Sequence, residues 1–149
     1  AGESRETALE AVRNGGGRTL TGGKGLDGDG FYLAPSLVEL EDFGSPLARE
    51  EVFAPVSALL KVHSADEAVR VANDVRYGLA AAVFTNDLDE AMKVADRIEA
   101  GLLKINGSTA GVDYHAPFGG IKQSGVGTKE QGLAARDFFT ESKTVLLSP

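Results

Sequence analysis

An internal repeat constrains the fold of this chain more than any other feature of its sequence. Residues 66–79 align with residues 89–102, and each copy begins with acidic residues, continues with apolar residues at helical spacing and ends in Gly-Leu. An apolar run completes each copy, at residues 79–84 and 102–105, and another precedes the repeat at residues 55–62. The resulting order of strand, helix, strand, helix, strand favours parallel strands joined by right-handed crossovers. The sequence therefore predicts an α/β fold with a mostly parallel sheet and a βαβαβ repeat.

Each helix of the repeat carries its own start and stop signals. Ser64 and Glu67 form a capping-box pattern before the first helix, and Asn86 or Asp87 can cap the second. The residues expected to end the helices in a left-handed conformation are Gly78 and Gly101. The apolar stripes expected to face the sheet are Ala68, Val71, Ala72 and Val75 in the first helix and Leu88, Ala91, Val94, Ala95 and Ile98 in the second.

The segments outside the repeat are less regular. A helix is expected at residues 4–14, where three glycines end it, and a short strand at residues 18–21. Residues 31–38 read as an extended segment, residues 128–139 as a further helix, and residues 140–147 as a closing strand. That strand comes too late in the chain to begin another unit of the repeat, so we expect it to pair elsewhere.

The composition excludes several classes of function. The 149 residues carry a net charge of −7 and no local cluster of basic residues, so nucleic acid is not an expected partner. The absence of cysteine removes disulfides, thiolate zinc sites and thiol nucleophiles, and two histidines are too few for a histidine-rich metal site. No apolar run reaches the roughly 20 residues that cross a bilayer, and no secretory signal is present, so we expect a cytoplasmic protein without a membrane partner.

Two local motifs suggest chemistry that their surroundings do not support. Residues 22–25 read GGKG, but a phosphate-binding loop needs glycine where Arg18 stands and serine or threonine where Gly25 stands. Ser124 lacks the G-x-S-x-G setting of a hydrolase nucleophile. We therefore interpret Ser124 as a loop serine, and the sequence predicts no catalytic residue and no metal ligand in this chain.

Two longer motifs carry a family resemblance. Residues 49–56 read REEVFAPV and residues 115–127 read HAPFGGIKQSGVG, and together they resemble the aldehyde dehydrogenase superfamily. The resemblance implies that Glu51 binds the ribose hydroxyls of a nicotinamide cofactor, NAD or NADP, and that Phe53 packs beside that ribose. A carboxylate can accept charge-assisted hydrogen bonds from two neighbouring hydroxyls, so the assignment is chemically sound. Ala54 stands where the family usually has glycine.

The resemblance covers nearly the whole chain and implies roles for its C-terminal third. It implies that Val112 and Phe118 line the aldehyde pocket, because the loop of residues 107–116 shapes substrate selectivity in the family. It also implies two parts: residues 1–139 are the C-terminal part of the catalytic domain, and residues 140–149 are a tail that pairs with a neighbouring subunit. The expected partners are a small aldehyde and further copies of the same chain.

Within the family, one group matches particular short segments. Residues 109–117 (TAGVDYHAP), 129–131 (KEQ) and 138–140 (FFT) look most like the α-ketoglutarate semialdehyde (2,5-dioxovalerate) dehydrogenases. In the family a cysteine attacks the aldehyde and hydride passes to NAD(P)+, so a chain without cysteine is expected to be inactive alone. Two alternatives stay open: a non-catalytic scaffold or assembly module, and a small-ligand binding domain that uses Glu51 and Phe53.

Overall fold

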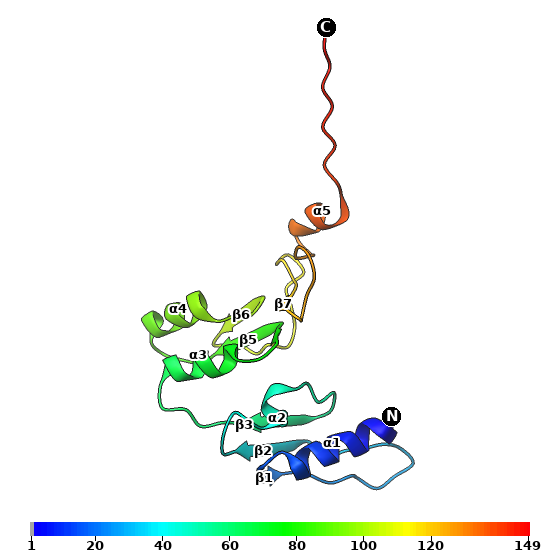
Figure 1. Ribbon diagram of the computed structural model, residues 1–149, viewed down its shortest axis with the longest axis vertical. Helices are drawn as coiled ribbons and strands as arrows, with labels where there is room; N and C mark the ends of the chain where they lie inside the picture. Colours follow the sequence, from blue (N-terminus) through cyan, green and yellow to red (C-terminus); the bar gives the residue numbers. More distant parts are fainter. Residues whose placement is uncertain (1) are drawn as a thin grey trace. The chain divides into compact units, whose positions relative to one another are not determined.

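The computed structural model describes residues 2–149, and the side chains of residues 5–149. It divides into two compact units at the bond between Val75 and Arg76. Figure 1 labels the helices and strands of both units. We call these two units the N-terminal unit and the C-terminal unit and describe each by itself. Both contain helices and strands, which confirms the predicted α/β class.

The N-terminal unit is built on a three-stranded sheet. Its elements are α1 (Gly2–Asn14), β1 (Gly17–Thr21), β2 (Ser36–Leu40), α2 (Pro46–Arg49), β3 (Val56–Leu59) and α3 (Ala65–Asn73). The strand order is β1-β2-β3, in which β2 pairs antiparallel with β1 and parallel with β3. Strand β2 is therefore central, and its residues alternate between buried and half-buried, as expected for a strand with one face on a core.

The core of the N-terminal unit lies between α1, α2 and the sheet. It is formed by Val12 of α1, Val38 and Leu40 of β2, and Leu47 of α2, all at most 8% exposed. Val52, in the loop after α2, packs against the same cluster. Burial of these aliphatic side chains fixes the helices on one face of the sheet.

An ion-pair network links the three strands of this sheet. The Glu39 carboxylate accepts a hydrogen bond of 2.7 Å from Nη2 of Arg18 and forms an ion pair of 2.6 Å with Nζ of Lys61. Glu39 lies on the central strand, and its partners lie on β1 and just after β3. The bond to Lys61, followed by the bond to Arg18, lowers the pKa of Glu39 from its ordinary value of 4.5 to about 2.

The C-terminal unit contains the second copy of the repeat. Its elements are β4 (Tyr77–Gly78), β5 (Ala80–Val83), α4 (Leu88–Arg97), β6 (Leu102–Ile105), β7 (Ile121–Lys122) and α5 (Ala134–Phe139). Strands β5 and β6 pair in parallel and α4 connects them, so the predicted strand–helix–strand unit is confirmed here. Strand β4 pairs antiparallel with β7, which brings the glycine-rich segment after residue 118 onto the end of the repeat.

The strands do not form the single, mostly parallel sheet that the sequence predicts. The described residues form one three-stranded sheet and two two-stranded sheets, and only the β2/β3 and β5/β6 pairs are parallel. Strand β3 takes β2 as its partner, although β2 precedes the repeat in the chain. The repeat sets the local helix–strand alternation, whereas the choice of partner depends on tertiary packing that it does not encode.

The helix starts follow their sequence signals. Oγ of Ser64 accepts from the amide of Glu67 at 3.1 Å, and the Glu67 carboxylate accepts from the amide of His63 at 2.8 Å. Of the two candidate caps for α4, the structure selects Asp87, whose carboxylate accepts from the amide of Glu90 at 3.1 Å. Both helices therefore begin where their capping residues predict.

The prediction that Gly78 and Gly101 end the helices is wrong. Helices α3 and α4 end at Asn73 and Arg97, and neither glycine has a positive φ. Gly78 lies in β4, where an added Cβ would be 2.6 Å from the carbonyl oxygen of Glu99. Gly101 precedes β6, and a Cβ there would collide with a backbone carbonyl of the glycine-rich segment. Both glycines permit close contact between backbones rather than a left-handed turn.

The apolar stripes are confirmed only in part. In α4, Ala91 and Val94 are buried as predicted, but Leu88 at the start of the helix is 73% exposed. In α3 the buried residue is Val69, whereas the predicted Ala72 is exposed. The face of α3 that packs is therefore rotated from the predicted stripe.

The chain after β7 contains less regular structure than predicted. The helix expected at residues 128–139 is limited to α5, Ala134–Phe139. Residues 140–149 form no strand within the described chain, and Val145, Leu146 and Leu147 are 75–95% exposed. Among the described residues, no helix combines the length and apolar character needed to span a bilayer.

Candidate functional site

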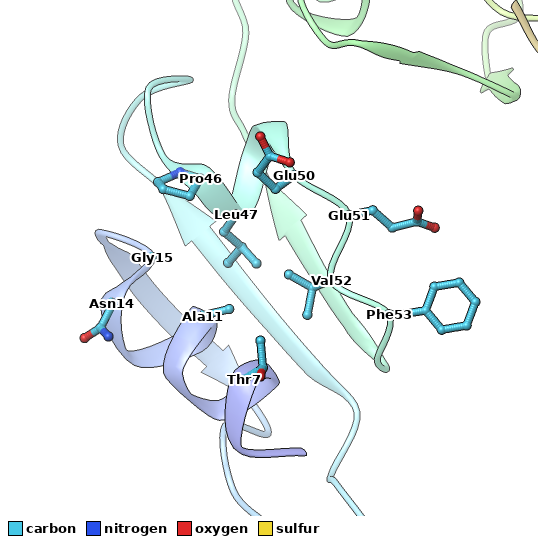
Figure 2. Close-up of a pocket in the computed structure, with 10 residues that line it drawn as sticks. All are labelled: Thr7, Ala11, Asn14, Gly15, Pro46, Leu47, Glu50, Glu51, Val52 and Phe53. Carbon is cyan, nitrogen blue, oxygen red and sulfur yellow. The ribbon is translucent and has the colours of Figure 1, made fainter. Parts of the chain in front are cut away.

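A hollow of about 490 Å³ lies in the N-terminal unit beside α1 and α2 (Figure 2). It is lined by Thr7, Ala11, Asn14, Gly15, Pro46, Leu47, Glu50, Glu51, Val52 and Phe53. The α1 residues follow a spacing of four and three, which places them on one face of the helix. These residues belong to none of the sequence motifs, and their spacing is the one signal that could have indicated them.

The loop that carries Glu51 and Phe53 is held firmly at its start. Oγ of Ser45 caps α2 by accepting from the amide of Leu47 at 3.2 Å, and it also donates to the carbonyl oxygen of Gly15 at the end of α1. The amide of Glu50 donates to the Pro46 carbonyl oxygen at 2.8 Å, which closes the single helical turn. The chain then leaves α2 in an extended conformation. The two sequence-predicted cofactor residues therefore stand on an anchored segment.

Alternation along this extended segment sorts its side chains onto two sides. Val52 points toward the core, whereas Glu51 and Phe53 both point away from α1 (Figure 2). The Phe53 ring is 90% exposed and the Glu51 side chain is exposed as well. The structure thus brings together a carboxylate and an aromatic face on one open side of the loop.

A carboxylate beside an exposed aromatic ring can bind a ligand that carries vicinal hydroxyls. An exposed carboxylate can accept hydrogen bonds from two vicinal hydroxyls, and those bonds are strengthened by its charge. The exposed ring of Phe53, one residue beyond Val52 and on the same side as Glu51, offers a flat apolar surface beside those hydroxyls. Burial of that ring by a ligand would recover hydrophobic free energy that the chain alone leaves unused.

A second hollow, of about 250 Å³, lies in the C-terminal unit and contains the predicted substrate residue Phe118. It is also lined by Leu79, Gly119, Gly120, Ser124, Gly125, Val126, Gly127, Thr128, Lys129, Glu130 and Phe138. Phe118 is fixed by two backbone hydrogen bonds with Glu130, at 2.6 Å and 2.9 Å. The contribution of Phe138 from α5 had no signal in the local sequence, because it depends on how the chain folds back after residue 132.

The other predicted substrate residue, Val112, lies outside this hollow. It belongs to the loop after β6 and is 38% exposed. It is not among the residues that line the Phe118 hollow. The structure therefore pairs Glu51 with Phe53 but does not bring Val112 and Phe118 into one cavity.

Ser124 has a structural contact that explains its position in the glycine-rich motif. Its hydroxyl oxygen accepts a hydrogen bond of 3.0 Å from the backbone amide of Gly78. The interpretation of Ser124 as a loop serine agrees with this contact. In the part of the chain that the structure describes, no group of three or more His, Asp or Glu side chains is arranged to hold a metal ion.

The comparison with known proteins agrees with this fold and these motifs. The model of the aldehyde dehydrogenase family matches residues 2–145, so the chain belongs to the aldehyde dehydrogenase family. The alpha-ketoglutaric semialdehyde dehydrogenase of Bacillus subtilis is 43% identical to it, over 95% of this chain and 30% of the relative. The alpha-ketoglutarate semialdehyde dehydrogenase of Haloferax volcanii is 44% identical, over 87% of this chain and 28% of the relative. The resemblance to this group is thereby confirmed.

The solved structures give the same result for the fold. The crystal structure of a Mycobacterium tuberculosis aldehyde dehydrogenase complexed with NAD+ matches 99% of this chain and 31% of its own, with a TM-score of 0.88 and 32% identity. The chain thus spans about 30% of the length of the curated relatives and solved structures that it resembles.

Proposed function

We propose that this chain supplies the C-terminal part of the catalytic domain, residues 1–139, and an oligomerisation strand, residues 140–149, to an NAD(P)-dependent aldehyde dehydrogenase. The observation that carries the proposal is the pair formed by Glu51 and Phe53, which point to the same open side of an anchored loop (Figure 2). In the complete enzyme the strands described above join a mostly parallel sheet. The reaction oxidises an aldehyde to its carboxylic acid, and the relatives favour a semialdehyde as the substrate.

The cofactor end of the site uses Glu51 and Phe53. The Glu51 carboxylate accepts hydrogen bonds from the nicotinamide ribose hydroxyls, and the Phe53 ring packs beside that ribose. NAD or NADP, when bound, supplies the acceptor for the hydride that leaves the substrate carbon. Two contacts from one rigid loop restrict the ribose to one orientation, which is the contribution that residues of this chain make to hydride transfer.

The substrate end of the site uses Phe118 and the loop of residues 107–116, which includes Val112. The Phe118 backbone is held by its bridge to Glu130, so its ring can serve as a fixed wall of the aldehyde pocket. An aromatic wall excludes water from the reacting carbonyl and limits the size of the aldehyde. This role rests on the family resemblance, since the hollow around Phe118 does not include Val112.

The chemistry itself requires a nucleophile that these residues do not contain. The 149 residues include no cysteine, so the attacking thiolate belongs to another part of the complete enzyme. The chain alone is therefore expected to show no aldehyde oxidation. We expect the complete enzyme to act in the cytoplasm, without nucleic acid or a membrane as partner.

Replacement of a matching segment tests this function directly. In a chimera, the 149-residue chain replaces the aligned part of the Bacillus subtilis relative. Formation of reduced cofactor is then followed with α-ketoglutarate semialdehyde and with NAD+ or NADP+. We expect turnover by the folded chimera and none by the 149-residue chain. Turnover by the chain alone, or a folded chimera that binds cofactor and does not oxidise the aldehyde, would contradict the proposal.

The exposed tail favours a second role in assembly. Val145, Leu146 and Leu147 are apolar, 75–95% exposed and without a strand partner in the described chain. An extended apolar segment gains pairing partners and buried area when it joins a sheet edge of another subunit. Sedimentation of the chain with and without residues 140–149 tests this role, and the same oligomeric state in both samples at every concentration would exclude it.

A further inference from the structure

One lysine of β6 reaches along the loop of residues 107–116 and binds it. Lys104 lies on β6, and its Nζ donates a hydrogen bond of 2.6 Å to the carbonyl oxygen of Gly111. The stem of the same side chain passes over the start of the loop, where Cδ of Lys104 is 3.7 Å from the Cβ position of Gly107. The side chain therefore spans the loop from its first residue to its fifth.

A separate contact fixes the base of the loop. Asn106 has a left-handed φ of 53°, and its amide group forms two hydrogen bonds of 2.9 Å with the backbone of Thr85. The backbone amide of Asn106 donates to the Val83 carbonyl oxygen at 2.8 Å. These bonds continue the β5/β6 pairing by one further residue and set the direction in which the loop leaves the sheet.

The far end of the loop is held as well. The amide of Gly132 donates to the carbonyl oxygen of Tyr114 at 3.1 Å, and Ala116 donates to Asp113 at 2.9 Å. The middle of the loop differs, because Gly111 has a φ of +76° and open space surrounds its Cβ position. A glycine in this conformation brings no side chain that could hold the segment.

We propose that Lys104 is a positioning residue for the aldehyde pocket: its side chain supports the middle of the loop and fixes Val112, the residue that follows Gly111. The inference rests on the proposed function, which places Val112 in the pocket wall. A hydrogen bond from an ammonium group is roughly twice as strong as one between neutral groups, so it can hold a segment in which the glycine offers no side chain. Without it, the described loop keeps the anchors at its two ends but loses this tie between β6 and Gly111.

The first experiment measures loop order in the 149-residue chain by NMR. Backbone order parameters of residues 110–113 are compared between the natural chain, Lys104→Met, Lys104→Arg and the control Lys93→Met on the exposed side of α4. We expect values near about 0.85 in the natural chain and below about 0.6 in Lys104→Met. Lys104→Arg keeps a charged donor and is expected to restore order, and Lys93→Met is expected to change nothing. Unchanged order in Lys104→Met would overturn the proposal.

The second experiment measures selectivity in the chimera with the Bacillus subtilis relative. With two semialdehydes that differ by one methylene, Lys104→Met is expected to change the ratio of their kcat/KM values by about 10-fold, because a pocket wall distinguishes a methylene by such factors. The change should appear in KM, with kcat for the better substrate within about 2-fold of the natural value. A loosened loop with an unaltered ratio and unaltered KM would overturn the role in positioning.

The two experiments separate the failure of this inference from the failure of the proposed function. An inactive chimera made with the natural sequence would count against the proposed function, and the NMR comparison would still decide whether Lys104 holds the loop. If the chimera is active and Lys104→Met does not change its selectivity between the two semialdehydes, the proposed function stands and only the positioning role of Lys104 is removed.

Discussion

The hydroxyl of Ser124 accepts a hydrogen bond of 3.0 Å from the backbone amide of Gly78, a residue 46 positions earlier in the chain. The amide of Gln123 donates to the Arg76 carbonyl oxygen at 3.0 Å, beside the β4/β7 pair. The glycine-rich motif is thus attached to the end of the first repeat copy by its serine and by its backbone. This attachment places Phe118 relative to β5.

Replacement of Ser124 by alanine should destabilise the C-terminal unit. The Gly78 amide is part-buried and would lose its acceptor, so the free energy of unfolding is expected to fall by about 1–3 kcal/mol. Urea unfolding followed by circular dichroism measures the change. Ser142→Ala, in the exposed tail, is the matched control and should unfold as the natural chain does. Equal midpoints for the two variants would show that the hydrogen bond contributes nothing.

Replacement of Gly101 by alanine should also be destabilising, for a steric reason. The added Cβ would collide with the carbonyl oxygen of Gly119, and the displaced backbone is expected to cost about 1–3 kcal/mol. Gly107→Ala is the control, because the nearest atoms to its Cβ position lie at ordinary contact distances of 3.7–3.9 Å. Thermal unfolding of both variants tests the prediction, which requires a lower Tm for Gly101→Ala than for the control.

The Glu39 network predicts a defined loss of stability in acid. Lys61, followed by Arg18, holds the pKa of Glu39 at about 2 in the folded chain, below the ordinary 4.5 of the unfolded chain. Folding therefore favours the ionised form, and this contribution is complete above pH 4.5 and disappears as the pH falls from 4.5 to about 2. Urea midpoints from pH 6 to about pH 2 should fall less steeply for Glu39→Gln than for the control Glu41→Gln. Parallel curves would exclude the network as a cause of acid sensitivity.

Replacement of Glu51 by glutamine should weaken cofactor handling in the chimera. The amide keeps the size of the side chain but loses the charge that strengthens its hydrogen bonds to the ribose, so KM for the cofactor should rise and hydride transfer should slow. A loss of about 10-fold in kcat/KM for the cofactor corresponds to one such bond. Glu10→Gln on α1 is the control. Unchanged kinetics and cofactor affinity in Glu51→Gln would remove Glu51 from the site.

Local signals in the sequence predicted local structure well. The Asp87 cap and the β5–α4–β6 unit follow from residues within a few positions of one another, where side-chain hydrogen bonds and helical periodicity dominate. The functions of Gly78 and Gly101 could not be read in this way. Both glycines make room for residues later in the chain: Gly78 for Glu99 and Ile121, and Gly101 for Gly119. The sequence of a repeat unit that ends in glycine is the same whether the glycine turns the backbone or makes room for another backbone segment.

In the candidate site, too, local features could be predicted from the sequence and tertiary contacts could not. Glu51 and Phe53 were predicted from a contiguous motif, and alternation in an extended segment suffices to place them on one side. Phe138 joins Phe118 only through tertiary folding, and no spacing in the sequence connects them. The position of Val112 depends on Lys104 and on the loop conformation, neither of which belongs to the family motif that pointed to the residue.

The contacts that hold the loop of residues 107–116 have a consequence for which mutations this loop tolerates. Lys104 binds the carbonyl oxygen of Gly111, and Asn106 binds the backbone of Thr85, so both anchors engage main-chain atoms. The side chains of residues 107–116 can be exchanged by mutation while these two contacts stay in place. The shape of the loop and the side chains that it carries can therefore change independently of each other.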